Sequence, residues 1–131
     1  MDLAEIKRAF ASVVAIPVTP FTADGSVDFH TYARLLERMV DSGITVVTPN
    51  GNTSEFYSLT AEEQRREVEV TTDAVRGQAM VLVGVGYDAR TAAEMARFAA
   101  ERGAQAVMVH QPVHPFKSDE GWLAYHKAVA D

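Results

Sequence analysis

The chain has 131 residues, of which 47% are hydrophobic and 23% charged, and its formal net charge is −6. This length suits a single domain with enough apolar residues for a core, and the acidic balance argues against a nucleic-acid partner. The sequence contains no cysteine, which excludes disulfides and thiolate chemistry and is compatible with a reducing compartment. Because we find neither a membrane-spanning apolar run nor a signal-peptide pattern, we expect a cytoplasmic protein that does not bind membranes.

Taken in chain order, the hydrophobic pattern predicts strands that alternate with helices. Residues 2–10 predict a short amphipathic helix, and residues 12–18 predict a first strand, although Pro17 cannot donate a strand hydrogen bond. Capping residues and glycines then mark where later elements begin and end. Further helices are predicted at 29–42, 61–75, 91–102 and from 119 onward, with strands at 44–47, 79–85 and 104–109.

These elements form a strand–helix unit that is repeated about four times, which defines an α/β fold. The strands are nearly continuous apolar runs, and such runs are typical of parallel sheets that are buried on both faces. Two architectures fit this pattern: a doubly wound open sheet, or half of a (β/α)8 TIM barrel. We favour the half barrel, as one partial domain over residues 1–131, because the chain stops with a helical pattern still running. Such a half barrel would leave strand edges uncovered.

The loop at 48–56 is the first candidate for a functional site. It follows a predicted strand, precedes a predicted helix, and is rich in small polar residues. In α/β proteins ligands bind at the carboxyl ends of the strands, where hydroxyl and backbone N–H groups can hold a carboxylate or phosphate. The alternative is that this loop is only a connection with a helix cap, as most short loops are.

Four segments, in the same order and at matching spacing, resemble the N-terminal half of the dihydrodipicolinate synthase and N-acetylneuraminate lyase family. Any one of them would be a weak signal, whereas four in register point to the family. The segments are Pro17-Val-Thr-Pro-Phe-Thr-Ala-Asp-Gly-Ser-Val-Asp28, Gly51-Asn-Thr-Ser-Glu-Phe56 with Ser58-Leu-Thr-Ala-Glu-Glu63, Gly84-Val-Gly86, and Ser118-Asp-Glu-Gly-Trp122.

The resemblance implies a homo-oligomeric TIM-barrel lyase, aldolase or dehydratase that forms a Schiff base with pyruvate or another 2-keto acid, without a cofactor or metal. In such a site Gly51, Thr53 and Ser54 would bind the substrate, with the Thr53 hydroxyl and N–H holding its carboxylate. Asn52 stands where the family has a threonine that starts a proton relay, and an amide cannot pass a proton as a hydroxyl does. His114 stands at the relay tyrosine and could do acid–base work of another kind. These departures suit a 2-keto-acid enzyme other than dihydrodipicolinate synthase itself.

The imine-forming lysine of the family belongs to the sixth strand, which this chain does not reach. The lysines present are Lys7, Lys117 and Lys127, and none matches that position. We therefore expect the chain alone to lack the covalent step. The alternative is a non-catalytic half-barrel module that associates with itself.

A metal-dependent enzyme built on histidines is a further, less favoured reading. His110 and His114 lie close together in the sequence, and His126 follows, but no pair of histidines at helical spacing with a third ligand stands out.

Overall fold

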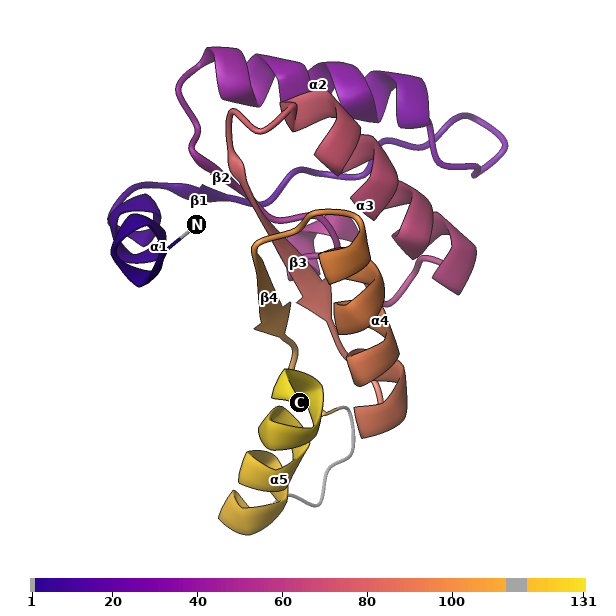
Figure 1. Ribbon diagram of the computed structural model, residues 1–131. Coiled ribbons are helices and arrows are strands. Elements are labelled where there is room, and N and C mark those ends of the chain that lie inside the picture. The colour runs from indigo at the N-terminus through magenta and orange to yellow at the C-terminus, as the bar shows by residue number, and fades with distance from the viewer. Residues whose placement is uncertain (1, 113–117) are drawn as a thin grey trace.

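The computed structural model describes residues 2–112 and 118–131, and it shows four parallel strands that alternate with helices (Figure 1). The elements in chain order are α1 (Leu3–Phe10), β1 (Val14–Ala15), α2 (Phe29–Asp41), β2 (Val46–Val47), the 3-10 helix η1 (Asn52–Ser54), α3 (Ala61–Val75), β3 (Met80–Val85), α4 (Ala89–Glu101), β4 (Ala106–Val109) and α5 (Asp119–Ala130). Within the described residues, no helix is both long and apolar enough to cross a membrane.

The sheet has the strand order β1-β2-β3-β4, and each neighbouring pair is parallel. Helices α2, α3 and α4 lie on one side of this sheet, whereas α1 lies on the other (Figure 1). A doubly wound sheet would reverse its strand order at a switch point and place connecting helices on both faces. The sequential order with all connecting helices on one face therefore confirms a partial (β/α) barrel.

Each face of the sheet has its own apolar core, because side chains alternate along a strand. Val81, Val83 and Val85 of β3 point to the helix side, where they join the larger core with α2, α3, α4 and α5. Met80 and Leu82 point to the opposite side, which corresponds to the barrel interior, where Ile6 and Ala9 of α1 pack against them. We call these two sides the outer and inner faces. In a complete barrel, further strands would pair with the edges of this sheet and enclose its inner face.

The first two strands are shorter than predicted. In β1 only Val14 and Ala15 pair, and the chain then reaches Pro17, which has no N–H to continue the pairing. The ladder to β2 extends by one further bond, from the Thr48 N–H to the Ala15 carbonyl at 2.8 Å. Among the described strands β1 pairs with β2 alone, so nearby apolar side chains stay open to solvent, and Val13 is 61% exposed.

The helix boundaries agree with the predicted caps at α2 and α3, whereas the start of α4 differs. The Asp28 carboxylate accepts from the Thr31 N–H, and Thr60 with Glu63 forms a complete capping box at the start of α3. Gly43 follows α2 with a φ of +88°, a conformation that glycine adopts without strain. Helix α4 begins two residues before the predicted start, since Asp88 caps it through bonds from the N–H groups of residues 90 and 91.

Candidate functional site

The loop after β2 folds over the carboxyl ends of the neighbouring strands. The Gly84 N–H at the end of β3 donates to the Pro49 carbonyl at 2.9 Å. Nε2 of His110, just after β4, lies 2.8 Å from the Asn50 carbonyl oxygen, and because a carbonyl only accepts, this nitrogen carries the proton. Asn50 itself adopts a left-handed conformation with a φ of 57°. The loop is thus fastened to β3 and to the residue after β4 before it enters η1.

Gly84 makes this arrangement possible because it has no side chain. A Cβ built on Gly84 would lie 1.9 Å from the Asn50 carbonyl oxygen and 2.8 Å from Nε2 of His110. By strand alternation this missing side chain would point to the inner face, next after Leu82. The space is filled instead by the loop backbone and by the imidazole ring, which also contacts the ring of Phe56 with centroids 4.2 Å apart.

Gly51 also packs closely, against the Ile16 side chain just after the first strand. It is buried, and a Cβ built there would lie 2.4 Å from Cγ2 of Ile16. The turn that begins η1 therefore rests directly on the chain after β1. This contact sets the distance between the loop and the carboxyl ends of the strands.

The structure brings four of the five predicted site residues into one turn. The side chains of Asn52 and Thr53 are exposed, whereas Gly51 and Ser54 are buried. The Ser54 hydroxyl donates to the Pro17 carbonyl at 2.5 Å, so this hydroxyl is occupied by backbone and anchors the turn. His114, the fifth residue, lies outside the described residues. We call the turn at 51–54 the cradle. It exposes the Asn52 and Thr53 side chains, while Gly51 and Ser54 at its ends are held by contacts with residues 16 and 17.

A buried carboxyl group, Glu67 of α3, joins the two ends of the cradle. Its Oε2 accepts from the Asn50 N–H at 3.3 Å, and its Oε1 is in a short hydrogen bond with the Thr19 hydroxyl. The same Thr19 hydroxyl lies 2.8 Å from the Ser54 carbonyl oxygen. The Glu67 side chain is fully buried, with 0% exposure. One carboxyl group therefore contacts residue 50 directly and residue 54 through Thr19.

Burial raises the pKa of Glu67 to about 7, because a charged carboxylate loses its hydration inside the protein. The hydrogen bonds with Thr19 and Asn50 act in the opposite direction, and the nearby Glu63 raises the pKa further. Burial also raises the pKa of Tyr32, whose hydroxyl lies 3.4 Å from that of Thr71. Within residues 2–112 and 118–131, no ion pair involves Glu67.

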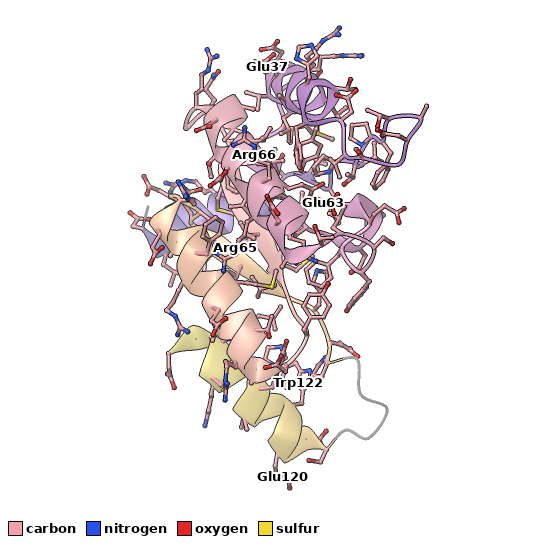
Figure 2. The ribbon with its side chains drawn as sticks, turned by 90° about the vertical axis from the view of Figure 1, so that its right-hand side faces the viewer. Glu37, Glu63, Arg65, Arg66, Glu120 and Trp122 are labelled. Carbon is pink, nitrogen blue, oxygen red and sulfur yellow. The ribbon has the colours of Figure 1, made fainter. Side chains whose placement is uncertain are left out.

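A cavity of about 220 Å³ lies on the outer side of the sheet, between α3 and α4. Its floor includes Val68 and Val83, and Arg65 lies at its rim with its guanidinium 4.8 Å from the centre of the Phe98 ring. Figure 2 shows Arg65 projecting from α3 beside α4. The Asn50 side chain, which lines this cavity, connects it to the residue before the cradle, since its Nδ2 donates to the Gln64 carbonyl at 3.2 Å. The cavity is thus separate from the cradle's exposed side.

The described residues offer neither a metal cluster nor a lysine at the cradle. His110 uses Nε2 to bond Asn50, and His126 of α5 donates from Nδ1 to the Trp122 carbonyl at 2.9 Å. In the part of the chain that the structure describes, no three His, Cys, Asp or Glu side chains are grouped as metal ligands. Lys7 and Lys127 are exposed on α1 and α5, and Lys117 falls outside the described residues.

Glu67, Thr19 and the structural part played by Gly84 were not predicted from the sequence. A signal for Glu67 was available, because it shares the buried side of α3 with Gln64 and Thr71 at helical spacing. An acidic residue on the buried side of a helix requires a partner, and this would have marked Glu67 for attention. His110 was considered only as a possible metal ligand, whereas the structure gives it a hydrogen bond to the loop.

Comparison with known proteins identifies relatives along nearly the whole chain. Residues 9–131 match the model of the dihydrodipicolinate synthetase family. A 4-hydroxy-tetrahydrodipicolinate synthase from Campylobacter jejuni subsp. doylei is 36% identical over 126 residues, which cover 95% of this chain and 42% of the relative. A synthase of the same name from Acidothermus cellulolyticus is 37% identical over 93% of this chain and 40% of its own length. The chain thus spans less than half the length of these relatives.

Solved structures agree with this result. Dihydrodipicolinate synthase from Bacillus clausii superimposes with a TM-score of 0.91 at 44% identity, covering 95% of this chain and 42% of that protein. YagE, a protein of the dihydrodipicolinic acid synthase family from E. coli K12 solved in complex with pyruvate, gives a TM-score of 0.82 at 32% identity over 88% of this chain and 40% of its own. By sequence and by fold, the chain belongs to the dihydrodipicolinate synthetase family and corresponds to the N-terminal part of its members.

Proposed function

We propose that this chain forms the carboxylate-binding half of the active site of a Schiff-base lyase that acts on pyruvate or another 2-keto acid. The observation that carries the proposal is the cradle at 51–54, which is fastened to the strand ends and presents the exposed Thr53 side chain. A hydroxyl group together with backbone N–H groups suits a carboxylate, because all of them donate hydrogen bonds. The relative YagE binds pyruvate, which supports this substrate class.

The finer assignments follow the family resemblance. Gly51, Thr53 and Ser54 form the substrate-binding turn, in which Ser54 acts through its backbone because its hydroxyl bonds Pro17. Asn52 and His114 take the positions of the proton relay, so acid–base work would fall to the imidazole, which titrates near neutrality. We further propose that the family's imine-forming lysine would come from a segment outside these 131 residues, that the chain alone is inactive, and that the working protein is a cytoplasmic homo-oligomer.

Replacing Thr53 by valine should weaken pyruvate binding about tenfold, the cost of losing one hydrogen bond to a charged group. Valine keeps the shape of threonine and removes only the hydroxyl group. We would follow backbone amide signals of the labelled chain by NMR while adding sodium pyruvate, and expect the largest shifts at residues 51–54. Ser42→Ala, which removes a hydroxyl at the far end of α2, is the matched control. Pyruvate shifts that avoid the cradle, or equal affinities in the wild type and Thr53→Val, would contradict the proposal.

Borohydride reduction in the presence of pyruvate should leave the mass of the isolated chain unchanged. The described lysines, Lys7 and Lys127, are exposed on α1 and α5 and do not lie at the cradle, where the ketone carbon of a bound 2-keto acid would have to meet the amine. Intact-mass spectrometry after reduction reads this out directly. A reduced adduct that forms on the chain at stoichiometric yield would show that it carries its own imine-forming lysine, and would overturn the inactivity that we propose.

The exposed apolar residues near β1 favour a second function, a half-barrel module that associates with itself. Val13 and Val18 are 61% and 60% exposed, and β1 has a neighbour on one side only. Such a strand edge is suited to pairing with another chain. Failure of pyruvate to shift the cradle signals, combined with self-association that depends on concentration, would favour this module over the enzyme.

A further inference from the structure

The cradle is held at both ends by the same carboxyl group. Its first end follows directly on Asn50, whose N–H donates to Oε2 of Glu67 at 3.3 Å. Its second end is Ser54, whose carbonyl oxygen lies 2.8 Å from the Thr19 hydroxyl, which in turn bonds Oε1 of Glu67. The residues between these two anchors are those proposed to hold the substrate. Small changes at Glu67 would therefore be transmitted to both sides of the binding turn.

Counting protons shows which form of Glu67 satisfies this network. The Thr19 hydroxyl has a single hydrogen, yet it lies within bonding distance of two oxygen atoms, the Ser54 carbonyl and Oε1 of Glu67. A carbonyl oxygen cannot donate, so the hydroxyl hydrogen must go to Ser54 if that bond exists. The contact between Thr19 and Glu67 then needs its own hydrogen, which a protonated carboxyl supplies. Both bonds are therefore formed only while Glu67 is neutral.

Loss of this proton would rearrange the network at one end only. An ionised Glu67 would draw the Thr19 hydrogen to itself, because a carboxylate is the stronger acceptor. The Ser54 carbonyl would then lose its donor, whereas the bond from the Asn50 N–H would persist and strengthen. The first end of the cradle would stay anchored and the second would be released.

The surroundings of Glu67 favour its neutral form. The ionisable groups that act on it are Tyr32 of α2, which is neutral at physiological pH, and Glu63 on α3 itself, which adds negative charge. From the loops after β1 and β2 it faces the hydroxyl of Thr19 and the backbone of Asn50, neither of which titrates. The carboxyl is also fully buried. A carboxyl in such a place holds its proton into the neutral range.

We propose that Glu67 is a positioning residue whose protonated carboxyl holds both ends of the cradle, and that its ionisation releases the Ser54 end and weakens the binding of 2-keto acids. The proposal rests on the proposed function for its ligand, but its structural part does not need a ligand. Glu67 does not touch the substrate. It acts through Asn50 and Thr19 on the turn that does.

The test is an NMR titration of the isotopically labelled chain, from about pH 5 to about pH 9, a window that brackets the raised carboxyl pKa. We would follow the side-chain carboxyl carbon of Glu67, identified by its loss in Glu67→Gln, and the carbonyl carbon of Ser54. Both should titrate with one midpoint in the wild type. In Glu67→Gln, whose amide donates to Thr19 as the protonated acid does, the Ser54 signal should stay at its low-pH value throughout. In Thr19→Val, the Ser54 signal should no longer follow Glu67.

Pyruvate affinity measured in the same titration completes the test. The dissociation constant should rise about threefold or more from the acidic to the basic end in the wild type, as expected when a ligand prefers one protonation state, and should stay constant in Glu67→Gln. Glu62→Gln, which removes an exposed carboxylate from the same helix, is the control and should behave as the wild type does. A Ser54 signal that ignores the Glu67 titration, or an affinity with the same pH dependence in Glu67→Gln, would overturn the positioning role. If Glu67 and Ser54 titrate together but pyruvate does not bind, the positioning role of Glu67 would be supported and the proposed function would be overturned instead.

Discussion

Gly84→Ala should lower the free energy of unfolding by at least about 3 kcal/mol, at the upper end of what one added methyl group costs in a packed interior. The new Cβ would lie 1.9 Å from the Asn50 carbonyl oxygen and 2.6 Å from its carbonyl carbon. Backbone atoms cannot rotate away as the end of a flexible side chain can. The loop after β2 would have to lift from the end of β3, which breaks the bonds that Gly84 and His110 make with it.

Urea unfolding followed by circular dichroism measures this loss, and Gly121→Ala is its matched control. Gly121 lies in α5, and the nearest atom to a Cβ there is the Ser118 hydroxyl oxygen at 3.2 Å. Because alanine is the better helix former, this control should be neutral or slightly stabilising. The cradle amide signals should move in Gly84→Ala and stay in place in Gly121→Ala. Equal stability of the two variants would mean that the close packing over Gly84 does not exist in solution.

The stability of the chain should decrease as the pH rises from about 4.5 to about 7, with Glu67 as the cause. The pKa of this carboxyl is raised from 4.5 in the unfolded chain to about 7 in the folded one. Between these values the folded state keeps a proton that the unfolded state has lost, so each increase in pH favours unfolding. This pKa difference corresponds to about 3 kcal/mol in the free energy of unfolding. The folded state loses this amount of stability fully above pH 7 and does not lose it below pH 4.5.

The difference in unfolding free energy between Glu67→Gln and the wild type isolates this contribution. Glutamine carries no titrating proton, yet it can donate to Thr19 and accept from the Asn50 N–H as the protonated acid does. The other titratable groups are the same in both proteins, so their contributions cancel in the difference. We therefore expect the variant to match the wild type near pH 4.5 and to exceed it increasingly towards pH 7. A difference that stays constant with pH would show that Glu67 titrates as an ordinary carboxyl.

Local sequence signals predicted most of the fold, because helix caps and strand patterns are short-range features. The capping box of Thr60 and Glu63, the cap at Asp28 and the glycine after α2 each act within four residues. The order of the units along the chain, together with the family resemblance, then predicted the partial barrel. The errors lie at strand ends, where Pro17 and the missing second neighbour of β1 shorten the pairing.

The candidate site was predicted only in part, since its supports come from distant segments. The cradle itself could be located because Gly51 to Ser54 are contiguous and follow a strand. The contact of Thr19 with Glu67 joins residues 48 positions apart, and that of His110 with Asn50 joins residues 60 apart. No local pattern records such a pairing. The need for Gly84 likewise depends on which backbone lies opposite to it, and only the folded structure shows this.

The strand order also has a consequence for how the chain reaches its native state. Every strand pairs with the strand that precedes or follows it in the sequence, so no pairing must wait for a remote segment. Each pairing closes a loop that contains a single helical crossover, and the entropy cost of closing a loop rises only slowly with its length. The βα units can therefore dock one after another as they leave the ribosome, with β1 and β2 paired before β4 is made. At each stage of synthesis, the strand that paired last would present an unpaired edge to which the next strand could add.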